Sequence, residues 1–355
     1  MPKVIVGMSG GVDSAVSAYL LKKEGYEVTG LTLRTWDADE NAYSRCCEID
    51  DARETAEMLG IRYYVQNCVG EFKEHVTKPF IDDYIHGITP NPCIVCNRYV
   101  KWERMIRALN ELGADYIATG HYASVLKLDN GRYSVRKARH LKKDQTYMLY
   151  ALTQEQLSKT LMPLGDYSKD EVRLMAKEAG IAVADKKDSQ EICFVTDGDY
   201  AKYIEENAEG RIPPEGNFVD EEGNILGRHK GIIHYTVGQR RGLNLPLGYH
   251  AYIKRICPDT NEIVLCREES VYTGKIICRD VNFLSIPPMK VGEKLRCNVK
   301  IRYQHPGQEG EITLLEENMV GVAFDDPVKA ATPGQSAVFY DNDGFVVGGG
   351  VIYKA

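Results

Sequence analysis

The residues Gly7-Met8-Ser9-Gly10-Gly11-Val12-Asp13-Ser14 lie between two sequence patterns of different period. Before them, Lys3-Val4-Ile5-Val6 is a short β-branched run, which is typical of a buried strand. After them, apolar residues at helical spacing continue to Lys23, and Gly25 ends the pattern. Glycines let backbone N–H groups curve around an anion, and a helix N-terminus adds partial positive charge. The sequence therefore predicts an anion-binding turn between a first strand and a first helix.

Hydroxyl and carboxylate side chains complete this turn. Ser9 and Ser14 can donate hydrogen bonds to phosphate, and Asp13 can hold a Mg²⁺ ion that bridges phosphates. The turn lacks the Gly-Lys-Ser/Thr of a Walker loop. A glycine pair after a strand is often only a tight turn, but Ser-Gly-Gly-Val-Asp-Ser at this junction resembles the PP-loop of ATP pyrophosphatases. That resemblance implies ATP binding, in a superfamily that holds both amidotransferase-type synthetases and RNA-thiolating enzymes.

Strand and helix patterns alternate through the first 190 residues. Residues 27–33, 62–65 and 116–119 are strand-like, and a capping box at Ser168-Lys169-Asp170-Glu171 opens a helix that ends at Gly180. The other helical patterns cover residues 50–59, 71–86 and 101–112. Strands separated by helices predict right-handed βαβ units and a parallel sheet.

The composition changes after about residue 205. Residues 210–216 form a linker rich in glycine and proline, and strand patterns dominate beyond it, with apolar residues alternating from Leu295 to Tyr303. We therefore predict an α/β chain: a PP-loop parallel-sheet nucleotide-binding domain, a small central β-rich domain and a C-terminal β-barrel. The predicted boundaries are residues 1–205, 206–273 and 274–355.

Composition and charge exclude several classes of protein. The chain is 43% hydrophobic and 27% charged, as in soluble globular proteins, so wholesale disorder is excluded. It has no apolar run long enough to span a membrane and no signal-peptide pattern, so we expect a cytoplasmic protein without membrane contact. The net charge of −7 argues against indiscriminate nucleic-acid binding, although a local basic face remains compatible with it.

Two cysteine segments differ from the rest. Cysteines in a reducing cytosol are mostly buried apolar residues, and a minority are catalytic or metal-bound. Cys93 and Cys96 form a Cys-x-x-Cys in a proline-stiffened segment, but no second pair completes four zinc ligands. Cys193 lies in the polar segment 188–194, and by itself it would more often be a buried structural thiol.

Taken together, these segments resemble the tRNA-specific 2-thiouridylase family over essentially the whole chain. The matching motifs occur in the family order: the PP-loop, Thr89 to Arg98, Thr119 to Tyr122, Lys143 to Gln145, Asp188 to Phe194, His234 to Leu243, Arg302-Tyr303 and Pro333 to Gln335. The resemblance implies that sulfur replaces the C2 oxygen of the wobble uridine in particular tRNAs. It implies tRNA and a sulfur donor as partners, the donor being a cysteine desulfurase or a sulfur-relay protein, and we expect a monomer.

The chemistry of that reaction requires two cysteines. The uridine C2 carbonyl is a poor electrophile, and adenylation by ATP turns its oxygen into a leaving group and releases pyrophosphate. A cysteine persulfide can then supply the sulfur nucleophile, and a second thiolate can resolve it. By the family pattern, Cys193 carries the persulfide, Cys96 is the second nucleophile, and the two form a transient disulfide.

The resemblance also assigns binding residues. Leu33, where the family typically has Met, and Gly120 join Gly7, Met8, Ser9, Gly10, Gly11, Val12, Asp13 and Ser14 at the ATP. The target base would be lined by Asn91, Pro92 and Cys93. Further RNA contacts would come from His121, Lys143, Asp144, Gln145, Arg302, Tyr303 and Gln335. Some family members have Asp at position 93, so Cys93 leaves a second interpretation open: an iron–sulfur cluster held by Cys93, Cys96 and Cys193.

A basic run supports RNA binding. Its cations lie at positions 132, 136, 137, 139, 142 and 143, without an acidic residue among them. Such local density is what phosphate contact requires in an acidic protein. Two rival hypotheses remain: a PP-loop synthetase acting on a small carboxylate would need neither the cysteine pair nor the barrel, and a non-catalytic RNA-binding or iron–sulfur protein would not need the PP-loop.

Overall fold

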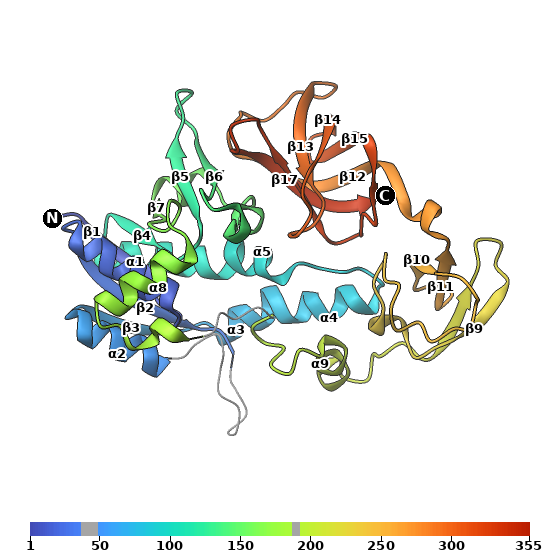
Figure 1. The fold of residues 1–355 in the computed structure, drawn as a ribbon, viewed down its shortest axis with the longest axis horizontal. Coiled ribbons are helices and arrows are strands. Elements are labelled where there is room, and N and C mark those ends of the chain that lie inside the picture. The colour runs from blue at the N-terminus through green and yellow to red at the C-terminus, as the bar shows by residue number, and fades with distance from the viewer. Residues whose placement is uncertain (37–48, 187–191) are drawn as a thin grey trace.

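The computed structural model describes residues 1–36, 49–186 and 192–355. Figure 1 shows a domain of sheet and helices at one end, a small β domain at the other, and a barrel beside helix α4 between them. Residues 188–191 of the predicted Cys193 motif lie outside the described residues, as do Cys46 and Cys47.

The first domain is built on the predicted parallel sheet, whose strand order is β3-β2-β1-β4-β7. Its strands are β1 (Lys3–Gly7), β2 (Glu27–Arg34), β3 (Arg62–Asn67), β4 (Tyr116–Ala118) and β7 (Thr160–Leu161). Helices that cover it include α1 (Val12–Lys23), α2 (Ile49–Leu59), α6 (Trp102–Leu112) and α8 (Lys169–Glu178). Successive side chains of a strand point to opposite faces, and both faces of β1 are buried. Ile5 packs in the cluster of α6, whereas Val4 and Val6 pack with residues of α1 and α2.

The predicted helix over residues 71–86 exists, but it has a more complex form. It consists of α3 (Val69–Phe72), the π-helical turn η1 (Lys73–Thr77) and α4 (Lys78–Ile85). The Cys-x-x-Cys segment is likewise helical, as α5 (Pro92–Cys96), and the π-helical turn η2 (Asn97–Lys101) joins it to α6. A π-helical turn inserts a residue into the helix and is frequent at functional sites.

A hairpin that the sequence patterns do not reveal projects from this domain. It consists of β5 (Ala123–Lys127) and β6 (Tyr133–Lys137), and η3 (Leu141–Lys143) and η4 (Thr146–Met148) follow it. Arg132 donates to the carbonyls of Phe283 and Leu284 in the C-terminal domain, at 2.7 and 2.8 Å. Part of the basic run therefore binds the barrel and is not simply a solvated face. The remaining elements of this domain are α7 (Gln154–Ser158) and η5 (Ala182–Asp185).

The central domain holds a four-stranded sheet of order β10-β11-β8-β9. Its strands are β8 (Gly216–Val219), β9 (Ile225–His229), β10 (Tyr252–Cys257) and β11 (Glu262–Cys266), with α9 (Tyr200–Asn207), η6 (Ile232–His234) and η7 (Glu268–Val271) beside them. β8 and β9 form an antiparallel hairpin around residues 220–224.

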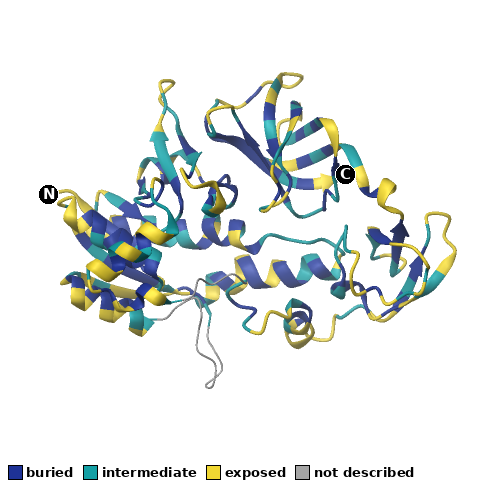
Figure 2. Ribbon diagram, in the orientation of Figure 1, coloured by how far each residue is buried: buried dark blue, intermediate teal, exposed yellow. Residues whose placement is uncertain are grey.

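The C-terminal domain is the expected closed barrel, with strand order β12-β15-β14-β13-β16-β17. Its strands are β12 (Tyr272–Phe283), β13 (Lys294–Lys300), β14 (Gln308–Glu316), β15 (Met319–Lys329), β16 (Ser336–Tyr340) and β17 (Val346–Lys354). Buried residues alternate with more exposed ones along β13 and β14, whereas β16 is buried throughout (Figure 2). The expected alternation from Leu295 ends as a strand at Lys300, before Tyr303. Burial raises the pKa of Cys278 and of Cys297 inside the barrel to about 12, which makes both thiols inert at neutral pH.

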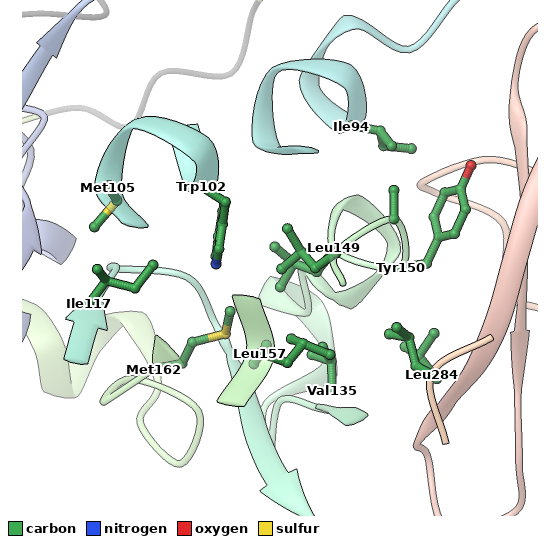
Figure 3. Packing of buried hydrophobic residues seen from close by; sticks show 14 of the residues in the cluster. Ile94, Trp102, Met105, Ile117, Val135, Leu149, Tyr150, Leu157, Met162 and Leu284 are labelled. Atoms are coloured by element: carbon green, nitrogen blue, oxygen red, sulfur yellow. The ribbon is translucent and has the colours of Figure 1, made fainter. Parts of the chain in front are cut away.

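One hydrophobic cluster joins the barrel to the first domain. Trp102 and Met105 of α6 share it with Leu149 and Tyr150, and Leu284 reaches it from the barrel (Figure 3). The Tyr147 hydroxyl also donates to the carbonyl of Ser336 over 2.8 Å. Because apolar burial and hydrogen bonds act at the same junction, the two domains have a fixed relative position.

Candidate active site

The Gly-rich turn has the geometry that the sequence predicts. Gly10 has φ of 71°, a left-handed conformation that glycine adopts at no steric cost. Gly11 is the N-cap of α1 and has no side chain to cover the first amide groups of the helix. The Ser9 amide donates to Ser14 Oγ over 3.2 Å, and Ser14 Oγ donates to the Gly11 carbonyl over 3.0 Å. These bonds hold residues 7–14 as one loop around the N-terminus of α1.

The other residues assigned to ATP reach the same edge of the sheet. Gly120 follows β4, and a Cβ at this position would lie 2.8 Å from backbone atoms of both Asp13 and Ser14. Only glycine fits such an approach. Leu33 lies near the carboxyl end of β2, half-buried, and the Met8 amide donates to Leu31 on the same strand. Ligands of open parallel sheets bind outside the carboxyl ends of the strands, which is where these residues gather.

Asp13 is bound by residues that sequence reasoning does not single out. Lys169 Nζ donates to Oδ1 and Oδ2 of Asp13 over 2.8 and 2.9 Å, and the Tyr122 hydroxyl donates to Oδ1 over 2.7 Å. Lys186 Nζ donates to the Gly10 carbonyl over 3.3 Å and to the Asp51 carboxylate. The one signal for Lys169 in the sequence is its place directly after Ser168, the N-cap of the predicted capping box.

Asp13 is a suitable donor for Mg²⁺ at this site. Magnesium prefers carboxylate oxygens with phosphates and waters, and the Asp13 carboxylate lies at the PP-loop. In the described ranges, no group of three or more His, Cys, Asp or Glu side chains is arranged to hold a metal ion.

The two cysteines assigned to sulfur transfer share one hydrophobic cluster. Cys96 ends α5 and is buried at 5% exposure, and Cys193 is half-buried against the same cluster. Phe194 packs in this cluster at ring-centroid distances of 5.6 Å to Phe72 and 5.2 Å to Phe80, both edge to face. Such aromatic contacts fix the backbone next to Cys193. Cys96 and Cys193 therefore border the same cluster, and their pairing in sulfur transfer stays a prediction.

The iron–sulfur interpretation stays a prediction. Cys93 is exposed although Cys96, on the same short helix, is buried. Cys93, Cys96 and Cys193 are all described, and they do not form a three-ligand metal set.

The segment assigned to the target base is held from two sides. The Asn91 side chain caps α5 by accepting from the Ile94 amide over 3.4 Å, and Pro92 occupies the first helical turn. From the barrel, Gln335 Nε2 donates to the carbonyls of Thr89 and Pro90 over 3.0 and 3.2 Å. Gln335, expected at the RNA, therefore contacts the backbone beside the base-binding residues.

His121, Asp144 and Gln145 also make contacts within the protein. Burial, with Lys101 nearby, lowers the pKa of His121 to about 3, so its ring is neutral at physiological pH, and Nδ1 lies 2.9 Å from Thr119 Oγ1. The buried Asp144 carboxylate accepts from the Ala138 amide and the Thr146 hydroxyl over 3.1 and 2.8 Å. Gln145 Oε1 accepts from the Tyr122 amide over 3.0 Å. Asp144 and Gln145 thereby position the half-buried Lys143 that precedes them.

The turn after β6 (residues 138–143), here called the basic turn, and the barrel line an open pocket of about 410 Å³. Lys137, Lys142 and Lys300 line it together with Tyr303 and His305. Arg302, next to Tyr303, donates to the carbonyl of Lys329 over 3.0 Å. Residues of the basic run and Tyr303 of the predicted Arg302-Tyr303 pair thus line one hollow.

Comparison with known proteins matches each of the three domains to a family model. Residues 2–197 match the tRNA methyl transferase HUP domain, residues 201–267 the tRNA methyl transferase PRC-barrel domain, and residues 273–352 the aminomethyltransferase beta-barrel domain. The chain is 50% identical over 361 residues to a tRNA-specific 2-thiouridylase MnmA of Lachnoclostridium phytofermentans, with full coverage of both chains. It is 52% identical to the MnmA of Acetivibrio thermocellus, over 99% of each chain.

The chain belongs to the tRNA-specific 2-thiouridylase family. The resemblance inferred from the sequence motifs is therefore confirmed, as is the fold that it implies: a parallel-sheet domain, a middle domain and a closed six-stranded barrel. The roles of individual 2-thiouridylase residues and the domain boundaries remain predictions.

Two solved structures resemble this 2-thiouridylase distantly. The U34-tRNA thiolase NcsA of Methanococcus maripaludis, with its [4Fe-4S] cluster, is 22% identical, with a TM-score of 0.35 over 59% of this chain and 67% of its own. A 4-thiouridine synthetase in complex with RNA and ATP is 15% identical, with a TM-score of 0.35 over 59% of this chain and 51% of its own. Among the described residues, no helix is both long and apolar enough to cross a membrane.

Proposed function

We propose that this chain is a tRNA-uridine 2-sulfurtransferase that converts the wobble uridine of tRNA to 2-thiouridine. ATP adenylates the C2 oxygen, and a persulfide on Cys193 then delivers sulfur, so AMP and pyrophosphate are released. The observation that carries the proposal is the match to 2-thiouridylases over the whole chain, in which a PP-loop and a clustered cysteine pair occur together.

In the first step, the uridine oxygen attacks the α-phosphorus of ATP, and the bond to pyrophosphate breaks. Amide groups of residues 7–14 and the N-terminus of α1 would stabilise the charge on the departing pyrophosphate. Gly120 lets the end of β4 approach the loop closely, and Leu33 would supply apolar contact to the adenosine. Magnesium bound by Asp13 would neutralise phosphate charge.

In the second step, the terminal sulfur of the Cys193 persulfide attacks C2, and AMP leaves with the C2 oxygen. The Cys96 thiolate then attacks Cys193 Sγ, which breaks the S–S bond and leaves sulfur on the base. The product is 2-thiouridine together with a Cys96–Cys193 disulfide, which an external thiol reduces. The packing of both residues against one cluster supports this pairing.

The tRNA would approach through the segment 91–93 and the hollow between the basic turn and the barrel. His121 stays neutral there and offers hydrogen bonds without a charge. We expect direct RNA contacts from Lys143, Arg302 and Tyr303. The residues that contact the RNA would be held in position by Gln335, Asp144 and Gln145. We further propose that a cysteine desulfurase or a sulfur-relay protein loads Cys193, and that the chain acts as a cytoplasmic monomer.

One assay tests the proposal against its rivals. Purified protein is incubated with ATP and unmodified tRNA, with and without a cysteine desulfurase and cysteine, and pyrophosphate and 2-thiouridine are measured. We expect pyrophosphate release that requires tRNA, and 2-thiouridine only with the sulfur donor. Pyrophosphate release with small carboxylates in place of tRNA would favour a synthetase, and no release at all would favour a non-catalytic protein.

A further inference from the structure

The PP-loop lacks a cation of its own. Residues 7–14 contain neither lysine nor arginine, and their one charged side chain, Asp13, is negative. The triphosphate of ATP carries several negative charges. In loops of the Walker type, a lysine of the loop itself binds these phosphates. If this chain binds ATP, a basic residue must reach the loop from elsewhere in the fold.

Within the described ranges, two lysines donate hydrogen bonds to atoms of this loop. Lys186 binds the Gly10 carbonyl and the Asp51 carboxylate, so its ammonium group ties the loop to α2. Lys169 binds both oxygens of Asp13 at 2.8 and 2.9 Å. The Lys169 side chain is 10% exposed and that of Asp13 is 31% exposed. A charge in such a partly buried place acts more strongly than one in open solvent.

The fold fixes the position of Lys169. It is the first residue of α8, directly after Ser168, whose hydroxyl accepts from the Glu171 amide in a complete capping box. Val172 and Ala176 of α8 pack in one buried cluster with Val16 of α1, the helix that the PP-loop opens. The base of the Lys169 side chain is therefore held beside the loop, while its flexible stem lets the ammonium group move.

From these contacts we propose that Lys169 is the lysine that binds the phosphates of ATP at the PP-loop. The proposal rests on the ATP-dependent function proposed above. Without nucleotide, Lys169 neutralises Asp13. When ATP binds, the ammonium group turns from the carboxylate to the phosphate oxygens, as a mobile point charge suited to phosphate.

A purely structural role makes a different prediction. If Lys169 only ties α8 to α1 through Asp13, its loss disturbs the whole nucleotide pocket, so ATP and adenosine lose affinity together. If Lys169 binds phosphate, ATP loses affinity and adenosine does not. The comparison of the two ligands therefore separates the two roles.

The experiment measures the affinities of ATP and adenosine by isothermal titration calorimetry for the wild type, Lys169→Gln and Lys169→Arg. Glutamine keeps a hydrogen-bond donor for Asp13 but removes the charge. We expect Lys169→Gln to weaken ATP binding about tenfold to a hundredfold, with adenosine within about twofold of the wild type. Lys169→Arg should restore most of the ATP affinity. The matched control is Lys177→Gln, because Lys177 lies on the same helix but pairs with Asp185 at 2.7 Å.

A second set of variants covers the case in which Lys169→Gln does not fold. With EDTA present, Asp13→Asn should bind ATP more tightly than the wild type, and Asp13→Asn with Lys169→Gln should lose that gain. The double variant places two neutral amides together, so no unpaired charge is buried.

The outcomes separate the two proposals. If the wild type binds adenosine and ATP equally weakly and releases no pyrophosphate with tRNA, the ATP-dependent function itself is wrong. If the wild type uses ATP but Lys169→Gln and the double variant keep its ATP affinity, only the role of Lys169 is wrong. A parallel loss of adenosine and ATP also overturns that role.

Discussion

Gln335 at the start of the β16 region donates a hydrogen bond from Nε2 to the carbonyl oxygen of Thr89, across 246 positions of sequence, at 3.0 Å. The Thr89 amide in turn donates to the carbonyl of Pro333 over 3.0 Å. A Cβ at Gly334 would lie 2.8 Å from Thr89 oxygen, so the two backbones are in direct contact. The barrel therefore holds the segment that leads to Cys93 and Cys96.

The first prediction follows from this contact. Gln335→Ala removes two hydrogen bonds to residues 89 and 90, so the base-binding segment should lose its fixed position. We expect kcat/KM for tRNA thiolation to fall about thirtyfold, since each of the two lost hydrogen bonds is worth about 1 kcal/mol, while ATP affinity stays unchanged. The matched control is Gln308→Ala, because Gln308 also lies in the barrel but binds Asp326. An equal loss in both variants would show that the barrel acts only through its stability.

The second prediction concerns the cysteine pair. Cys193→Ser should abolish 2-thiouridine but let adenylated tRNA accumulate, because activation precedes sulfur attack. Cys96→Ser should instead trap tRNA on Cys193 through a disulfide bond to the C2 sulfur, which an added thiol releases. Denaturing gels with and without dithiothreitol, followed by mass spectrometry, distinguish the two products.

The control for the cysteine variants is Cys257→Ser, because Cys257 is also half-buried but lies on β10 of the central domain. This variant should retain wild-type thiolation. Persulfide sulfur found on Cys257 or Cys93, and not on Cys193, would contradict the assignment.

The third prediction is a loss of stability in acid. Burial, with Arg302 and Lys300 nearby, lowers the pKa of His305 to about 4, against about 6.5 in the unfolded chain. Between these values the unfolded state binds more protons, so acid favours unfolding, by about 1.4 kcal/mol per pH unit for this group. From pH 6.5 to pH 5, His305 alone should lower the free energy of unfolding by about 2 kcal/mol.

Urea denaturation of the wild type and His305→Gln at both pH values measures this effect. Glutamine does not titrate, so the variant should lose less stability in acid than the wild type. His250→Gln serves as the control, because His250 is exposed. Equal losses in the wild type and in His305→Gln would mean that His305 becomes protonated in the folded state.

Local patterns predicted the first domain because its signals lie close together in the sequence. The turn at residues 7–14 and the capping box at Ser168 each need only a few neighbours to be recognised. The hairpin β5–β6 was missed, because Arg132, Arg136 and Lys137 mask the period of two with charge. The side chains of these residues contact the barrel. For example, Lys137 Nζ lies 4.1 Å from the ring centroid of Tyr340.

In the candidate site, too, local motifs could be predicted from the sequence, whereas contacts made by tertiary packing could not. The sequence could name Asp13, Cys96 and Cys193 by their motifs, but a contact such as Lys169 with Asp13 spans 156 positions and arises only when α8 packs on α1. Gln335 is the reverse case, because its predicted RNA contact stays untested and the structure shows a contact that the motif does not predict. Its motif indicates RNA, whereas its side chain binds the protein backbone, because the turn before β16 packs against residues 88–90.

The last prediction concerns how an acidic protein binds tRNA. Arg132 binds barrel carbonyls and Lys137 lies over an aromatic ring, whereas Arg139 and Lys142 are exposed on the turn after β6. Each phosphate contact by Lys or Arg releases counterions, so the logarithm of affinity falls with the logarithm of salt by about 0.7 to 0.9 per contact. Changing Arg139 and Lys142 together to Ala should therefore flatten the slope by about 1.5, with ATP affinity unchanged.

Fluorescence-anisotropy titrations of labelled tRNA across a salt series measure this slope. The charge-matched control is Lys22→Ala with Lys23→Ala, two exposed residues in the last turn of α1. The PP-loop lies at the first turn of this helix, so these lysines are at the opposite edge of the sheet and should leave the slope unchanged. If both double variants flatten the slope equally, tRNA responds only to the net charge of the protein. If neither does, the phosphates contact a different face, and the hollow beside Tyr303 is not where the tRNA backbone runs.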